Sequence, residues 1–231
     1  MISDDILKEI KSIFGKKWIT RKGLKVPEAK DVALGNEAVT LSGTVLYADM
    51  ADSTGLVNGF RSWFAAEVYK AYLLGACRVI RSHGGEITAF DGDRVMAVFL
   101  GDYKNTNAAK AALHINYLVK RTNEALRGAY PTTAYTLRHS VGIDTGDLFV
   151  ARTGIRNAND LVWVGRAANY AAKLSALSEG DYNIYITEDV YNKLNNEAKF
   201  YGPDKKPMWE KRSWTARQIT VYRSNWWWNV K

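Results

Sequence analysis

Two aspartates stand where apolar strands are expected to end. Asp49 closes the apolar run VLYAD, and Asp93 lies in the turn DGD between EITAF and RVMAVFL. In an antiparallel sheet these two strand ends can lie side by side, where two carboxylates repel each other unless a cation separates them. Mg²⁺ is often held by one or two carboxylates together with substrate phosphates. The pair therefore predicts a divalent-cation site, although Asp-Gly is also a favoured turn pair.

The residues that follow Asp49 are suited to binding an anion. The sequence MADSTG offers backbone N–H groups and two hydroxyl groups in a tight turn that is expected to open a helix. Such a turn can bind phosphate. A cation beside a phosphate site is the layout of phosphoryl transfer. The alternative is that Asp52 or Ser53 only caps the helix.

A third polar group lies in VWVGRAANYAAKLSAL, residues 162–177. Asn169 and Lys173 are spaced so that they share one face of a predicted helix, and Arg166 lies one turn earlier. These side chains could reach a common ligand. Taken alone, a basic helix face is more often simply solvated.

Together the three stretches resemble the catalytic domain of class III nucleotidyl cyclases. YADMADST resembles the first metal-binding strand and phosphate loop, and GGEITAFDGDRVMAVF resembles the hairpin with the second metal aspartate. SVGIDTGD resembles the next strand and turn, and VGRAANYAAKL resembles the segment with the catalytic asparagine and a basic residue. The resemblance covers about residues 42–190. It implies a ferredoxin-like α+β fold, with a mostly antiparallel sheet covered by helices, and a homodimer with its sites at the interface.

The resemblance also implies roles for single residues. Asp49 and Asp93 would hold two Mg²⁺ or Mn²⁺ ions per active site, and Met50 would offer its carbonyl oxygen. One ion would help to activate the ribose 3′-hydroxyl, and the other would bind the triphosphate. Asn169 would orient the ribose, and Lys173 would neutralise charge in the transition state. The residues expected to bind phosphate are Ala51, Asp52, Ser53 and Thr54.

The sequence departs from the family pattern at three positions. Arg usually stands where this chain has Lys173, and Lys lacks the planar guanidinium fork, so Arg166 or Arg94 could share its role. Purine cyclases usually read the base with polar side chains at the positions of Ala89 and Val162. Because losing hydrogen-bonding readers changes selectivity strongly, a different base is expected.

This pattern resembles the pyrimidine cyclases of the bacterial Pycsar anti-phage systems. It implies conversion of UTP to 3′,5′-cyclic UMP and pyrophosphate, with the product activating a separate effector. Cyclic CMP, a purine cyclase, a catalytically silent nucleotide-binding homologue and a nucleic-acid-binding module remain alternatives, the last supported only by charge and the tryptophan tail. The side chains expected to shape the base pocket are Tyr47, Ala89, Phe90, Arg94, Val162 and Trp163.

Hydrophobic spacing and turn residues predict the elements that position these side chains. Strands are expected at 45–49, 86–90, 94–100, 182–187 and 218–222, with a further strand pair that turns near DTGD at 144–147. Helices are expected at 3–14, 60–82 and 106–126, and from about residues 166 and 187. Residues 16–38 are expected to be irregular and residues 55–59 to form a loop. We therefore expect a lead-in at 1–40 and a catalytic domain at 41–231 with a tryptophan-rich extension.

Composition fits a globular protein in a reducing compartment. The 231 residues are 47% hydrophobic and carry a formal net charge of +8, which fits an anionic partner. The single cysteine, Cys77, is expected in the core and permits no disulfide within the chain. We see no signal-peptide pattern and no apolar run of membrane-spanning length, so a cytoplasmic protein is expected. The tail SNWWWNVK is expected to pack against the domain or a partner, although a base-stacking surface is an alternative.

Overall fold

The computed structural model describes residues 2–177 and 179–230. Its first half contains α1 (Ile2–Gly15), β1 (Ile19–Lys22), β2 (Glu37–Met50), α2 (Ser53–Gly59), α3 (Ser62–Ser82), β3 (Glu86–Asp91), β4 (Arg94–Phe99) and α4 (Lys104–Ala129). Its second half contains β5 (His139–Ile155), β6 (Ala158–Val164), α5 (Arg166–Ser175), β7 (Ile184–Thr187), α6 (Glu188–Asn192), α7 (Asn196–Lys199), β8 (Phe200–Tyr201), β9 (Lys206–Pro207), β10 (Glu210–Trp214) and β11 (Ile219–Ser224).

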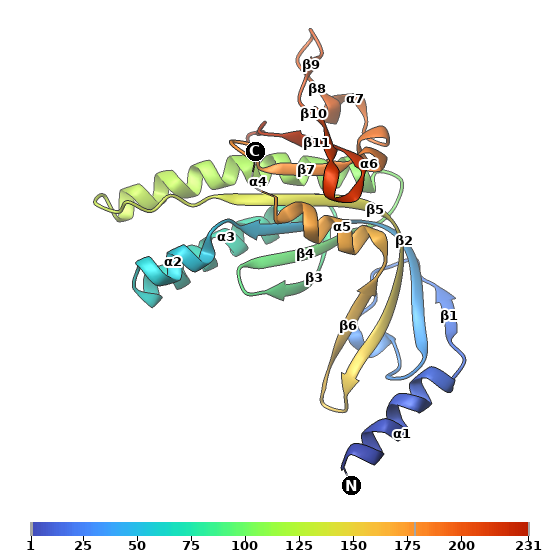
Figure 1. The fold of residues 1–231 in the computed structure, drawn as a ribbon. Coiled ribbons are helices and arrows are strands. Elements are labelled where there is room, and N and C mark those ends of the chain that lie inside the picture. Colours follow the sequence, from blue (N-terminus) through green and yellow to red (C-terminus); the bar gives the residue numbers. More distant parts are fainter. Residues whose placement is uncertain (1, 178, 231) are drawn as a thin grey trace.

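One large sheet organises the molecule. Its strand order is β10-β11-β7-β5-β2-β4-β3, with β1 paired to β2 and β6 paired to β5 (Figure 1). The β1–β2 and β5–β7 pairs are parallel, and the other pairs of this sheet are antiparallel. The prediction of an α+β fold with a mostly antiparallel sheet is therefore confirmed.

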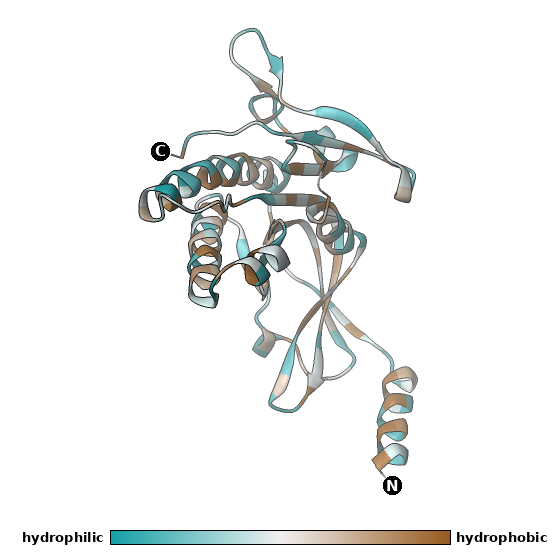
Figure 2. Cartoon of the chain, turned by 60° about the vertical axis from the view of Figure 1, so that its left-hand side comes forward, coloured by the Kyte–Doolittle hydropathy of each residue, from teal (hydrophilic) through white to brown (hydrophobic). Residues whose placement is uncertain are grey.

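Helices cover the two faces of this sheet unequally. Alternate residues of β2 point to opposite faces, as strand geometry requires. Leu46 and Ala48 join a core cluster with residues of α3 and α4, whereas Val45 joins a second cluster with Ala167 and Ala171 of α5. Figure 2 shows hydrophobic and hydrophilic residues alternating along these helices and strands, as expected for elements with one buried face. The α3–α4 layer is the larger core, and α5 covers only part of the other face.

Two glycines turn the chain where the sequence predicts. Gly84 follows α3 with φ of +77°, a left-handed conformation that glycine adopts without strain at a helix end. Gly92 has φ of +61° in the turn between β3 and β4. The predicted long helix and the Asp-Gly hairpin are therefore confirmed.

The expected turn near DTGD is wrong, because residues 139–155 form the single strand β5. The polar residues that indicated a turn instead find partners inside the fold. Asp144 is fully buried and accepts a hydrogen bond from the Thr187 hydroxyl at 2.6 Å. Thr44 donates its hydroxyl to Thr145 at 3.0 Å. The turn occurs later, at Arg156 and Asn157, where Asn157 has φ of +68°.

Two other expectations about irregular segments need correction. Residues 55–59 belong to α2 rather than to a loop. The segment 16–38 is not irregular throughout, because Ile19–Lys22 forms β1 beside Glu37–Thr40 of β2. The expected boundary at residue 40 consequently falls inside β2.

The far halves of β2 and β5 leave the main body together with β1 and β6 and end near α1 (Figure 1). We call these elements, together with α1 and the segment 16–18 that follows it, the arm. None of the residues of α1 is buried. At the other end of the chain, Trp226 and Trp228 pack against the α3–α4 core. The expectation that the tryptophan tail packs against the domain is thus confirmed. In the described ranges no helix combines the length and the hydrophobicity needed to cross a bilayer.

A glycine determines how closely α5 lies on the sheet. A Cβ atom at Gly142 would lie 2.1 Å from the carbonyl oxygen of Ala171 and 2.3 Å from the amide nitrogen of Ser175. Both neighbours are backbone atoms, so no rotamer change can relieve the overlap. At Gly146 of the same strand, the nearest atom to such a Cβ is 3.9 Å away.

We predict that Gly142→Ala lowers the free energy of unfolding by about 3 kcal/mol or more, because α5 must move off the sheet. Gly146→Ala is the matched control, since it adds the same methyl group in ordinary contact. Urea unfolding of both variants measures the difference. Equal midpoints would show that α5 adjusts freely.

Candidate active site

The structure brings Asp49 and Asp93 together. In the β2–β4 ladder Asp49 lies opposite Arg94, and Asp93 immediately precedes Arg94. The two carboxylates affect each other: burial raises the pKa of Asp49 to about 6, with a further rise from the charge of Asp93 that Arg94 partly offsets. The prediction that these two strand ends lie side by side is therefore confirmed.

Buried polar atoms without a hydrogen-bond partner gather around this pair. Within the described ranges they include Asp93 Oδ2, Arg94 Nε, Ser140 Oγ and Tyr72 OH. Ser140 lies opposite Asp49 in the β2–β5 ladder. Because buried polar groups are nearly always paired in folded proteins, such a cluster fits a place where an ion or substrate completes the bonding.

The donor set fits a hard divalent cation. In the described part of the chain, no three His, Cys, Asp or Glu side chains gather as a metal site, so Asp49 and Asp93 are the two carboxylates available here. Met50, the last residue of β2, buries its side chain in the core and could contribute only its carbonyl oxygen. Mg²⁺ and Mn²⁺ prefer oxygen ligands and accept the remainder from substrate phosphates or water.

Residues 51–54 form a tight turn into α2. Asp52 is the N-cap with φ of +58°, and its carboxylate accepts from the Gly55 N–H at 3.3 Å. The capping alternative for Asp52 is therefore confirmed. The Ala51 N–H already donates to the Arg138 carbonyl at 2.9 Å. Ser53 and Thr54 begin α2, where N–H groups lack intrahelical acceptors, so these two residues offer donors to an anion.

Three of the residues assigned to a base pocket share the face of Asp49. Tyr47 lies two residues before Asp49 on β2, and the Arg94 guanidinium lies 5.3 Å from the Tyr47 ring centroid. Arg94 also pairs with Asp91 at 2.6 Å. Ala89 lies opposite Met96, which lies opposite Tyr47, and both Ala89 and Tyr47 pack against the α5-side cluster. These side chains form one continuous surface beside the carboxylates.

The other three residues assigned to the base pocket do not all lie on this surface. Phe90 follows Ala89 on β3, so its side chain points to the opposite side, where it is 59% exposed. On β6, Val162 is 38% exposed and Trp163 is buried in the α5-side cluster. Because neighbouring strand residues alternate, Val162 and Trp163 point to opposite sides of β6. Within one copy these two side chains therefore do not line the same surface.

The polar side chains of α5 are not bonded to the carboxylates. Asn169 and Lys173 are exposed, and in the described part of the chain no hydrogen bond or ion pair joins them to Asp49 or Asp93. Arg166 is occupied, because it pairs with Asp144 at 3.3 Å and with Asp189. This arrangement holds the start of α5 to β5 and α6, which is a structural role.

Tyr72 and Ser140 lie beside the carboxylate pair but were not predicted from the sequence. Burial, followed by the charges of Asp49 and Asp93, raises the pKa of Tyr72 well above its usual value. Tyr72 sits in a regular apolar pattern on α3, which indicates only a core residue. Ser140 could be found only from the β2–β5 register, which no local signal in the sequence supplies.

Comparison with other proteins gives full-length relatives. No protein-family model matches the chain. It is 49% identical to a uridylate cyclase from Xanthomonas perforans and 46% identical to one from Burkholderia cepacia, in each case covering 99% of both chains. Among solved structures it is similar to an adenylyl cyclase from P. aeruginosa, with a TM-score of 0.67 and 21% identity over 80% of this chain and 95% of that chain.

The carboxylate pair predicts an unusual response of stability to substitution. Because Asp49 is ionised at pH 7 against burial and the charge of Asp93, Asp49→Asn should raise the thermal midpoint in EDTA by about 2–4 °C. Added Mn²⁺ should raise the midpoint of the unsubstituted protein but not that of the variant. Differential scanning calorimetry measures both changes.

The matched control is Asp102→Asn, which neutralises an exposed aspartate in the turn before α4. It should keep the response to Mn²⁺. A lower midpoint for Asp49→Asn in EDTA, or an undiminished response of that variant to Mn²⁺, would contradict a cation site at Asp49 and Asp93.

Proposed function

The chain belongs to the uridylate cyclase family, and we propose that it converts UTP to 3′,5′-cyclic UMP and pyrophosphate. The observation that carries this proposal is the meeting of Asp49 and Asp93 among unsatisfied buried polar atoms, in a chain that matches its relatives over their full length. In the reaction the ribose 3′-oxygen attacks the α-phosphorus. The bond from the α-phosphorus to the bridging oxygen breaks, pyrophosphate leaves, and the hydroxyl proton passes to solvent.

Asp49, Asp93 and the Met50 carbonyl would hold two Mg²⁺ or Mn²⁺ ions. When bound, such ions would lower the pKa of the 3′-hydroxyl and neutralise phosphate charge. The N–H groups of Ser53 and Thr54 would donate to phosphate oxygens at the start of α2. Ala51 and Asp52 would shape this turn rather than bind phosphate directly, since the Ala51 N–H and the Asp52 carboxylate already have partners.

Asn169 would orient the ribose, and Lys173 would neutralise the charge that grows on the phosphate oxygens in the transition state. Both side chains are exposed on α5, and among the described residues no hydrogen bond or ion pair joins them to the carboxylates of the same chain. This absence of bonding supports a homodimer in which each site takes its carboxylates from one copy and Asn169 and Lys173 from the other.

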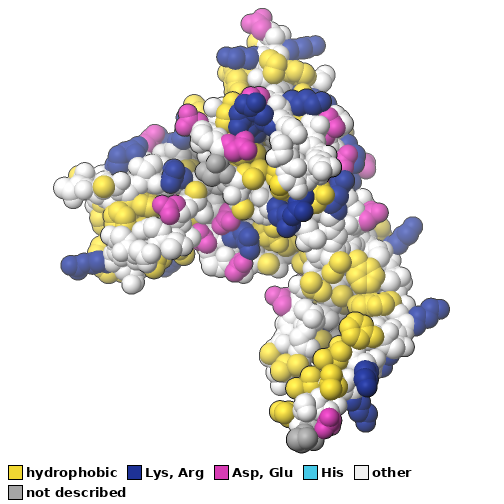
Figure 3. All heavy atoms as spheres, in the orientation of Figure 1, with side chains coloured by type: hydrophobic (Ala, Val, Ile, Leu, Met, Phe, Trp, Pro, Cys, Tyr) yellow, Lys and Arg dark blue, Asp and Glu magenta, His cyan; other side chains and the backbone are white. Residues whose placement is uncertain are grey.

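Exposed apolar side chains on the arm also support association of two copies. Figure 3 shows hydrophobic side chains gathered on the arm at the lower right of the view. They include Ile6, Ile13, Trp18 and Val164, each more than 40% exposed. Apolar surface of this kind usually marks an interaction site.

Uracil would be read by the surface formed by Tyr47, Ala89 and Arg94. Ala89 cannot donate or accept a hydrogen bond, whereas the buried Arg94 Nε lacks a partner in the described chain. A donor at this place suits a uracil carbonyl oxygen. It would disfavour cytosine, which has an amino group where uracil has its second carbonyl.

We further infer that cyclic UMP acts as a second messenger for a separate anti-phage effector, as the resemblance to Pycsar cyclases implies. The enzyme would work in the cytoplasm, where nucleoside triphosphates are available.

With Mn²⁺, we predict that the purified protein forms cyclic UMP from UTP at least about 100-fold faster than cyclic products from ATP, GTP or CTP. Mass spectrometry of separate reactions identifies each product. Cyclic CMP as the main product would support the proposed mechanism but show that the enzyme selects cytosine rather than uracil. A cyclic purine nucleotide as the main product would contradict the reading of Ala89 and Arg94.

We predict that Asp49→Asn and Asn169→Ala are each nearly inactive, but that the two variants regain activity when unfolded together and refolded as a mixture. A mixed dimer keeps one site with both native residues, so random pairing restores about a quarter of the native rate. Each variant refolded alone is the control. A mixture no more active than the separate variants would contradict sites shared between two copies.

A further inference from the structure

A groove lies between the tryptophan tail and the helical layer. Its volume is about 1190 Å³, which is large enough for a ligand of nucleotide size. One wall is the end of α3 with α4, and the other is the turn after α7 with Phe200 and Tyr201. Residues 225–230 form the rest of the lining as the tail runs back over α4 (Figure 1). Neither Asp49 nor Asp93 lines this groove.

The tail is fixed in place, so the groove is a formed surface. The Trp228 N–H donates to the Leu113 carbonyl at 3.2 Å. The Asn116 side-chain amide donates to the carbonyls of Asn225 and Trp226 at 3.2 and 2.9 Å. A preformed surface loses little entropy when a ligand binds.

Aromatic rings line the groove and remain partly accessible. The Trp226 ring lies 5.3 Å from the Tyr201 ring, and the Trp227 ring stacks on Tyr117 at 5.4 Å. Trp227 is still 43% exposed. Nucleic-acid bases stack on such rings with little regard to sequence, because every base has a π-face.

Positive charge accompanies these rings. Lys120 Nζ lies 4.4 Å from the Trp227 ring centroid, and Lys206 Nζ lies 5.5 Å from that of Trp226. The acidic side chain in the lining, Glu197, is already paired with Lys110. Aromatic faces with flexible cations beside them are complementary to a planar base that carries a phosphate.

Two histidines supply polar edges in the same groove. His83 Nε2 and His114 Nδ1 lie 2.7 Å apart, so one ring donates a hydrogen bond to the other. Burial, and then the positive charges around them, lower the pKa of His83 to about 4, and burial with Lys110 lowers the pKa of His114. Neutral imidazoles can both donate and accept hydrogen bonds, as recognition of a base edge requires.

We propose that this groove is a second ligand site, separate from the catalytic carboxylates, that binds a nucleoside phosphate. The base stacks among Trp226, Trp227 and Tyr201, and Lys120 and Lys206 meet the phosphate. The site requires no divalent cation and stands independently of the catalytic proposal. The ligand is either a free nucleotide or a nucleotide unit of a single-stranded nucleic acid.

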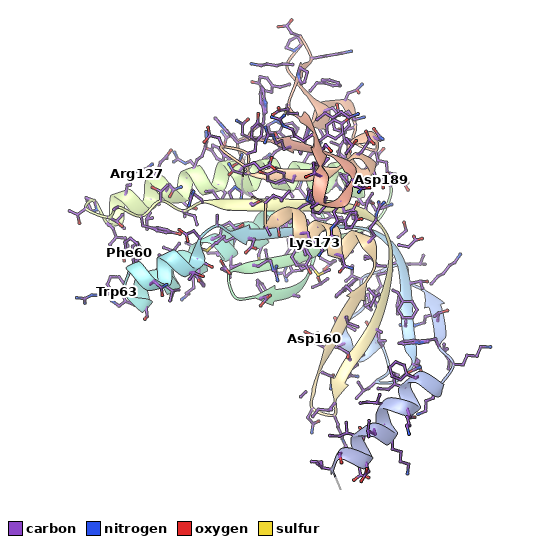
Figure 4. The ribbon with its side chains drawn as sticks, viewed as in Figure 1. Phe60, Trp63, Arg127, Asp160, Lys173 and Asp189 are labelled. Carbon is purple, nitrogen blue, oxygen red and sulfur yellow. The ribbon has the colours of Figure 1, made fainter. Side chains whose placement is uncertain are left out.

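The test is isothermal titration calorimetry with uridine 5′-monophosphate on the full chain carrying Asp49→Asn, in EDTA. These conditions remove cation-dependent binding at the carboxylates. We expect one nucleotide bound per chain. Adding Lys120→Gln or Trp227→Ala should weaken binding at least about tenfold. Arg127→Gln is the matched control, because Arg127 lies at the far end of α4 and should not change the affinity (Figure 4).

No heat of binding at millimolar nucleotide would overturn the proposal. Binding that neither groove substitution weakens would overturn it as well. Circular dichroism shows whether each variant is folded. If one of the two groove variants does not fold, the other still tests the proposal. UTP turnover by the unsubstituted protein is measured separately, so failure of the groove and failure of the catalytic proposal are distinguishable.

A parallel titration with hexauridylate separates the two ligand sources. Tighter binding of the oligomer than of the monophosphate, with strong weakening by salt, assigns the groove to single-stranded nucleic acid. Equal or weaker binding of the oligomer assigns it to a free nucleotide. Either result upholds a site for a base with its phosphate.

Discussion

Repulsion between two carboxylates is the constraint around which this structure is arranged. Asp49 and Asp93 lie together at the ends of β2 and β4, where burial and mutual charge raise the pKa of Asp49 to about 6. Separating them would relieve the repulsion, but the antiparallel register of the two strands prevents it. The rest of the fold contributes the rigidity that keeps this unfavourable pair in place.

That rigidity comes from packing on both faces of the sheet. On one face, α3 and α4 form the larger core and place Tyr72 beneath the carboxylates. On the other, α5 lies directly on β5 because Gly142 has no side chain. Asn169 and Lys173 lie exposed on this helix, and among the described residues neither is bonded to the carboxylates of its own chain.

Local signals predicted the parts of the site that depend on local structure. Strand ends, the Asp-Gly hairpin and the helix that carries Asn169 follow from hydrophobic spacing and turn residues. What failed depends on contacts between distant residues. Asp144 looks like a turn residue until Thr187 and Arg166 satisfy it within the sheet. The partner of Asp49 on β5, Ser140, depends in the same way on a register that spans about ninety residues of chain.

The length of β2 connects the arm directly to the carboxylate pair. This strand begins in the arm at Glu37 and ends at Met50, beside the carboxylate of Asp49. At about 3.3 Å per residue its path is roughly 45 Å long, and it bends where the arm joins the main body while remaining paired with β5 (Figure 1). One hydrogen-bonded ladder thus connects the arm to the carboxylates without an intervening loop. Two copies that hold each other by their arms would therefore align their catalytic ends over a distance that no loop could control.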